Sequence, residues 1–158
     1  MNKLGLLEKT GLKWGIITFL GLGAYFLIMK AFGLTYIIEL RVLNAAIMFT
    51  GLWFSIKDYK RNNSGFDYFS GLGVGLLTAF IASTIFAVFG ILYLEVINPS
   101  FMTELKQSEP LGFYLNPYLA TFQIFIEGTA SGFSISYAIM QFLKKPMLAE
   151  VKEINKRG

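Results

Sequence analysis

Residues 68–94 read YFSGLGVGLLTAFIASTIFAVFGILYL and contain no Lys, Arg, Asp or Glu. A helix crosses the roughly 30 Å hydrocarbon core of a bilayer with about 20 mostly apolar residues, because each residue adds about 1.5 Å. This stretch exceeds that length without a single charge. It therefore predicts a transmembrane helix, which we place at about residues 69–96.

On both sides of this stretch, the charged residues occur in clusters, and three further apolar runs lie between these clusters. The whole chain is 54% hydrophobic. Two of these runs reach the length of a span only when they are extended through Glu39 and Arg41 or through Glu127. We predict an all-α polytopic membrane protein with one domain over residues 1–158 and four transmembrane helices in two hairpins. The predicted spans cover residues 12–29, 37–56, 69–96 and 117–143, and the longest extracytoplasmic loop covers residues 97–116.

The basic residues predict the orientation, because Lys and Arg are enriched in the cytoplasmic loops of membrane proteins. Eleven of the 14 lie near the two termini or in the segment between the hairpins, and the other three are Lys30, Arg41 and Lys106. Both termini are therefore expected in the cytoplasm. Basic residues that flank apolar spans also account for the net charge of +4 without a nucleic-acid partner.

Small residues recur every fourth position on the third and fourth predicted spans, which places them on one face of each helix. In lipid, such faces let two helix backbones approach closely. We expect the two helices to pack against each other within one chain, with homodimerisation as the alternative. The residues are Gly71, Gly75, Ala79 and Ser83 on the third span and Gly128, Gly132 and Ser136 on the fourth.

Glu127 is the only ionisable residue far from both ends of a predicted span. Charges at such depth are costly and usually face other helices, where they are paired or functional. One interpretation is a structural pair with Arg41 or Asn44. The other is a proton or cation site, or a contact for a substrate head group. The polar residues near its face of the helix are Gln123, Ser131, Ser134 and Gln141.

Residue types that carry out chemistry are scarce in this chain. It has no Cys and no His, which removes thiolate ligands, cysteine nucleophiles and the usual general base. The glycine-rich run from Gly71 to Gly75 opens an apolar helix and lacks the preceding strand and the Lys of a phosphate-binding loop. We predict no catalytic residue, no metal site and no cofactor. We interpret the side chains of the Phe-rich runs as facing lipid, with no further role.

Four short motifs occur in a fixed order along the chain: ELRVLN at residues 39–44, IKDYK at 56–60, FSG at 69–71 and INPSF at 97–101. In this order they resemble domain-of-unknown-function family 4199, a family of small membrane proteins from Bacteroidota. The resemblance covers nearly the whole chain and implies a four-span protein of the bacterial cytoplasmic (inner) membrane. It implies no assigned activity and supplies no catalytic residue.

Three functions fit these features. We favour a non-enzymatic accessory or scaffolding subunit of a bacterial envelope system, which stabilises a membrane-protein partner in the lipid bilayer. The alternative is a small oligomeric transporter or lipid-carrier translocase that uses Glu127 in the membrane. A membrane-embedded lipid-modifying enzyme comes third, because one carboxylate is too little to define a reaction.

Overall fold

The computed structural model describes residues 3–34, 38–108 and 112–157, and this part of the chain is helical without a strand. The all-α prediction is therefore confirmed for the described residues. The elements are α1 (Lys3–Ala31), α2 (Ile38–Asn62), α3 (Tyr68–Leu92), the π-helical turn η1 (Tyr93–Ile97), α4 (Pro99–Ser108), the 3-10 turn η2 (Gly112–Tyr114) and α5 (Pro117–Arg157).

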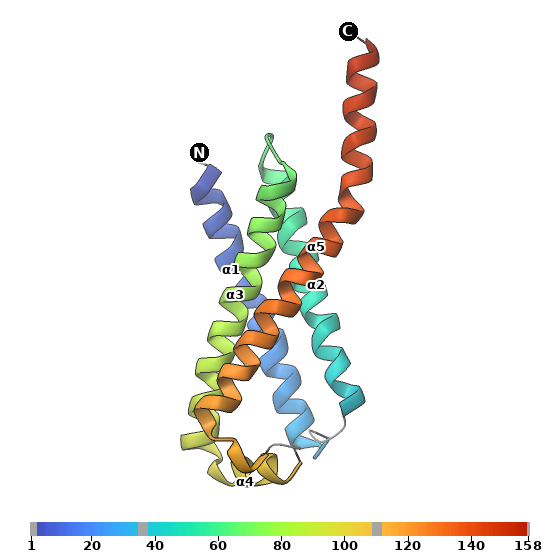
Figure 1. Cartoon of the computed structure of the whole chain (residues 1–158). Coiled ribbons are helices and arrows are strands. Elements are labelled where there is room, and N and C mark those ends of the chain that lie inside the picture. Colours follow the sequence, from blue (N-terminus) through green and yellow to red (C-terminus); the bar gives the residue numbers. More distant parts are fainter. Residues whose placement is uncertain (1–2, 35–37, 109–111, 158) are drawn as a thin grey trace.

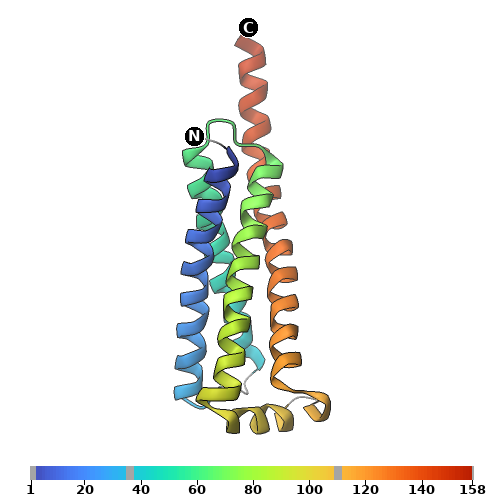
Figure 2. The ribbon, with the colours of Figure 1, turned by 90° about the vertical axis from the view of Figure 1, so that its left-hand side faces the viewer.

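Four long helices lie side by side, and the short helix α4 lies across one end of them (Figures 1 and 2). The helix α3 packs against each of the other three, most extensively against α5 and α1. Two segments, Gly5–Ala31 and Tyr68–Ile97, are long and apolar enough to cross a membrane. They contain the first and third predicted spans. The helices α2 and α5 carry more polar residues.

The helix α5 differs most from its predicted extent. The sequence predicts an end at Leu143, before Lys144, Lys145 and Pro146, but the helix continues to Arg157 and projects beyond the other helices (Figure 1). Proline inside a helix removes one backbone hydrogen bond and bends the axis. The Lys, Glu, Leu and Ala residues that follow are strong helix formers, so the helix continues through Pro146 to Arg157.

The longest predicted connection, residues 97–116, contains two short elements, α4 and η2. Asn98 and Asn116, each followed by Pro, cap helices. The Asn98 side chain accepts a hydrogen bond from the Phe101 backbone N–H at 3.3 Å, and the Asn116 side chain accepts one from Leu119 at 2.8 Å. Phe101 is only 6% exposed because α4 packs against η1 and its ring meets Phe26 of α1.

The interface between α3 and α5 brings the predicted small residues together in four successive layers. Gly71 faces Met140, Gly75 faces Ser136, Ala79 faces Gly132 and Ser83 faces Gly128. A Cβ atom added at any of these glycines would lie within 3.0 Å of the residue opposite, which is closer than real Cβ contacts. In each layer the residue opposite therefore fills the space where a side chain on the glycine would lie.

The core of the four helices lies in the half of the molecule away from α4. Leu52 and Ile56 of α2 are fully buried there against Val74 of α3 and Met140 of α5. Ser55 and Thr78 join α2 to α3 by a buried hydrogen bond of 2.7 Å between their hydroxyl groups. This half therefore holds all four long helices together.

A polar cluster joins α1 to α2 at the end opposite α4. The Asp58 carboxylate accepts hydrogen bonds of 2.9 Å from the Trp14 indole N–H and from the Lys13 ammonium group. Asn62 donates a third, at 3.0 Å. The Trp14 bond first, and the Lys13 bond next, hold the pKa of Asp58 below its usual range.

Candidate functional site

A cavity of about 370 Å³ lies near the α4 end, between all four long helices, and we call it the lateral pocket. Its walls come from α1, α2, α3 and α5, while Phe101 and Leu105 of α4 line its end. Residues from α1 and α3, such as Leu22 and Ser83, are buried at its back. Several from α2 and α5, among them Asn44 and Glu127, are exposed. The pocket therefore opens sideways between α2 and α5.

The position of α2 explains why the pocket forms. Its second half packs into the core through Met48, Leu52 and Ile56. A second apolar core near α4 combines Tyr93, Phe101 and other residues, but no described residue of α2 belongs to it. Figure 1 shows α2 and α5 diverging toward the α4 end. The space between the diverging halves is the lateral pocket.

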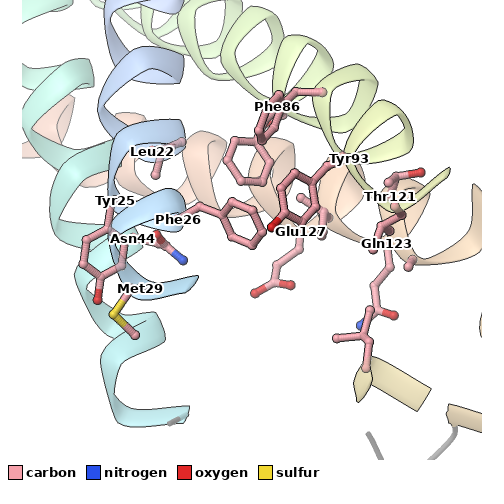
Figure 3. Close-up of a pocket in the computed structure, with 18 of the residues that line it drawn as sticks. Leu22, Tyr25, Phe26, Met29, Asn44, Phe86, Tyr93, Thr121, Gln123 and Glu127 are labelled. Carbon is pink, nitrogen blue, oxygen red and sulfur yellow. The ribbon is translucent and has the colours of Figure 1, made fainter. Parts of the chain in front are cut away.

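Glu127 lies in this pocket, and Figure 3 shows its carboxylate pointing into the open space. Gln123 and Ser131, one helical turn before and after it, line the same pocket. Within the part of the chain that the structure describes, no side chain hydrogen-bonds to or forms an ion pair with Glu127. The carboxylate is therefore available to a bound molecule.

The structure places the two predicted partners of Glu127 differently. Asn44 projects into the lateral pocket from α2 (Figure 3). The side chain of Arg41 lies outside the described part of the structure, so the predicted pair of Glu127 with Arg41 stays a prediction. Nearby, the Tyr25 hydroxyl donates a hydrogen bond of 2.8 Å to the Leu40 carbonyl and so ties the start of α2 to α1.

Ser83 adds a second polar group to the wall of the pocket. It is only 3% exposed, it lines the pocket, and its hydroxyl has no hydrogen-bond partner among the described residues. A buried hydroxyl without a partner costs roughly 1–3 kcal/mol. A polar group of a bound molecule would remove that cost.

Aromatic rings line the pocket wall on α1 and α3. Phe26 and Tyr93 meet edge to face with their ring centroids 5.1 Å apart, and Phe86 and Phe89 extend the cluster. The prediction that Phe-rich runs only face lipid is wrong for these residues. Phe86 and Phe89 of α3 and Tyr93 of η1 recur at helical spacing, a pattern that places them on one face.

The helix α4 closes the end of the pocket. Lys30 of α1 forms an ion pair of 2.8 Å with Glu104, and its ammonium group lies 3.9 Å from the centre of the Phe101 ring. Phe101 also packs against Phe26 and Tyr93. These contacts hold α4 across the ends of α1 and α3.

The structure thus brings together Glu127, Gln123, Ser131 and Asn44, which the sequence singles out. It separates two further polar residues of α5 from them. Ser134 bonds to the Ala130 carbonyl and Gln141 to the Tyr68 hydroxyl, and neither lines the pocket. Ser83, expected only to pack against α5, does so and also contributes to the pocket wall.

Comparison with known proteins agrees with the resemblance seen in the sequence. Residues 13–145 match the family described as "Protein of unknown function (DUF4199)". No curated protein and no solved structure matches the chain. The matched segment includes most of α1, all of α2, α3 and α4, and the part of α5 that lines the pocket. The chain belongs to the DUF4199 family.

Proposed function

We propose that this chain is an integral membrane protein that binds an amphipathic, lipid-like molecule in the lateral pocket, as a small transporter or lipid-carrier translocase would. The protein crosses the cytoplasmic membrane of a bacterium four times, with both termini in the cytoplasm and α4 on the outer side. The observation that carries the proposal is the Glu127 carboxylate, which pairs with no described side chain and lies in a pocket that opens between two helices.

The chemistry of the pocket supports an amphipathic occupant. Its back wall is apolar and aromatic, so it favours hydrocarbon or ring groups. Glu127, Gln123 and Asn44 place polar groups along its open side. Small-molecule sites commonly combine a mostly apolar wall with a few polar groups that orient the ligand. A lipid-like molecule in the membrane could enter between α2 and α5 without passing through water.

Photocrosslinking tests this function. The full chain is reconstituted in vesicles of phosphatidylethanolamine and phosphatidylglycerol with a phospholipid that carries a diazirine on its acyl chain. Crosslinks should concentrate on the pocket-lining parts of α3 and α5. Ala45→Phe places a ring inside the pocket and should remove these crosslinks. Ala130→Phe, at an exposed alanine of α5 that does not line the pocket, is the matched control.

The proposal fails if the crosslinks are spread evenly over the lipid-facing surface and Ala45→Phe leaves them unchanged. An even spread is what a surface that only contacts bulk lipid would give. The loss of pocket crosslinks in both phenylalanine variants would also count against it, because Ala130→Phe adds the same bulk outside the pocket.

An accessory role is the second candidate, and the extension of α5 favours it. The helix continues 14 residues beyond Leu143, the predicted end of its span, to Arg157 and projects past the other helices (Figure 1). A projecting helix offers a surface for a membrane-protein partner. Truncation after Leu143 should leave the thermal stability of the remainder unchanged and abolish co-purification of one dominant partner. Equal recovery of that partner by the truncated chain would refute the role assigned to this extension.

A further inference from the structure

We infer that the amphiphile bound in the lateral pocket carries a positive charge, which lies between the carboxylate of Glu127 and the aromatic rings of α1 and α3. This inference rests on the function proposed above and names its ligand class. The ligand is an apolar molecule with an ammonium or similar cationic group.

Among the described residues that line the pocket, the charges favour a cation. Glu127 is the only carboxylate among the described lining residues, and none of those residues is Lys or Arg. Lys30, at the same end of α1, does not line the pocket and is already paired with Glu104. A carboxylate in a low-dielectric site attracts a cation far more strongly than it does in water. A cationic ligand therefore supplies the counter-charge that a membrane-embedded carboxylate needs.

The aromatic residues supply the second attraction. A ligand cation is drawn to the face of an aromatic ring when it lies within about 6 Å of the ring centre, and aromatic cages bind quaternary ammonium groups in this way. Phe26, Tyr93 and Glu127 line the same pocket, and Figure 3 labels all three. Lys30 over the ring of Phe101 shows the same contact within this chain. Carboxylate and rings together favour a cation over a neutral head group.

The buried hydroxyl of Ser83 points to a ligand independently of Glu127. It has no hydrogen-bond partner in the described structure although it lines the pocket. It faces Gly128, the residue next to Glu127. A polar group bound at Glu127 can therefore also reach this hydroxyl. Ser83 thus adds a buried polar group at the back of the pocket, opposite the polar groups of its open side.

Two hydrophobic ions of the same shape and opposite charge test the inference. The full chain in dodecyl maltoside is dialysed to equilibrium against tetraphenylphosphonium or tetraphenylborate. The cation should bind saturably and at least tenfold more tightly than the anion. Glu127→Gln should abolish that preference, and Glu127→Asp, which keeps the charge, should retain it. Glu95→Gln removes the same charge at an exposed position outside the pocket and should change nothing.

Equal binding of both ions, with no effect of Glu127→Gln, would overturn the inference. The phenylalanine variants then tell whether the pocket itself survives as a binding site. If Ala45→Phe abolishes binding of both ions and Ala130→Phe does not, only the charge preference is wrong. If Ala45→Phe changes nothing, both the charge preference and the proposed function are wrong.

Discussion

Glu127 is the residue at which a structural and a ligand-binding role give opposite results. A carboxylate paired with Arg41 contributes to folding, whereas one that faces an open pocket costs free energy until a ligand binds. The described side chains provide no partner for it, which supports the second role. The sequence alone could identify the residue, since its depth in a predicted span is visible, but not its surroundings.

Replacement of Glu127 by Gln keeps the shape of the side chain and removes its charge. We expect the melting temperature in detergent to stay the same or rise, because no described group loses a partner. Breaking a buried ion pair would instead cost about 3–5 kcal/mol. A double-mutant cycle with Arg41→Gln measures this difference. Additive effects of the two substitutions on stability would support the ligand-binding role of Glu127. Strong coupling between them would support the structural pair of Glu127 with Arg41.

Asp58 gives a pH-dependent prediction. Its hydrogen bonds with Trp14 and Lys13 lower its pKa in the folded state. The contribution of the Asp58 carboxylate to stability is therefore fully present above its pKa in the unfolded chain, about 3.9. It is lost as the pH falls through the lower pKa of the folded state. Asp58→Asn should lower stability by about 1–2 kcal/mol at pH 7.

The difference in stability between Asp58→Asn and the wild type should become smaller as the medium becomes acidic. Thermal unfolding in dodecyl maltoside between pH 7 and pH 3 measures that convergence. An equal loss of stability at both ends of this range would show that the Asp58 charge is not the cause. Asp67→Asn is the control, because this exposed carboxylate bonds only within its own turn and not to another helix.

Among the elements, the contact of α3 with α5 was predictable and the lining of the pocket was not. The four-residue spacing of Gly71 and Gly75 on α3, and of Gly128 and Gly132 on α5, can be read from the sequence. It places the glycines of each helix on one face. Whether Phe86 faces lipid or a cavity depends on how far α2 stands from α5. That distance arises from packing among several helices, and no single helix encodes it.

The closeness of α3 and α5 can be tested with two glycines on one helix. A Cβ at Gly75 would lie 2.5 Å from the Ser136 hydroxyl oxygen, whereas one at Gly73 would lie 3.6 Å from Leu7, an ordinary contact. Gly75→Ala should therefore destabilise the protein by about 1–3 kcal/mol through overpacking. Gly73→Ala should be neutral or stabilising, because Ala favours a helix over Gly by about 1 kcal/mol. Equal melting temperatures for the two variants would contradict this packing.

The docking of α4 depends on Phe101 more than on the Lys30–Glu104 ion pair. Phe101→Ala should cost about 3–5 kcal/mol of local stability, since its ring is buried. Exposed ion pairs usually contribute less than about 1 kcal/mol. Hydrogen exchange in α4 should become much faster in Phe101→Ala. In Phe113→Ala, whose ring is 90% exposed, it should stay as in the wild type. Unchanged exchange in Phe101→Ala would show that α4 is held by other contacts.

For the whole molecule, the proposed topology can be tested directly because the chain contains no Cys. Ser64 lies between α2 and α3, and Gln107 lies in α4 at the opposite end (Figures 1 and 2). Both are exposed. In intact cells a membrane-impermeant maleimide should label Gln107→Cys but not Ser64→Cys. Permeabilised cells should label both. Labelling of both in intact cells would refute the four-span arrangement.

The sequence predicts the four long helices, and the positions of its Lys and Arg residues predict how these helices are oriented in a membrane. Both predictions depend only on composition along the chain. The sequence does not predict that α2 and α5 diverge toward the α4 end (Figure 1), because exposed and cavity-lining positions there have the same apolar character. The extension of α5 past Pro146 is missed for another reason. Proline makes a helix end more probable without enforcing it.

The sideways opening between α2 and α5 determines how occupancy of the proposed site would respond to dilution. A molecule that enters from the bilayer is counted per lipid, so its mole fraction in the membrane replaces its molarity in the buffer. Adding empty vesicles at constant protein should therefore empty the pocket, while adding buffer to the same vesicles should leave it filled. The thickness and composition of the surrounding bilayer then become part of the binding constant.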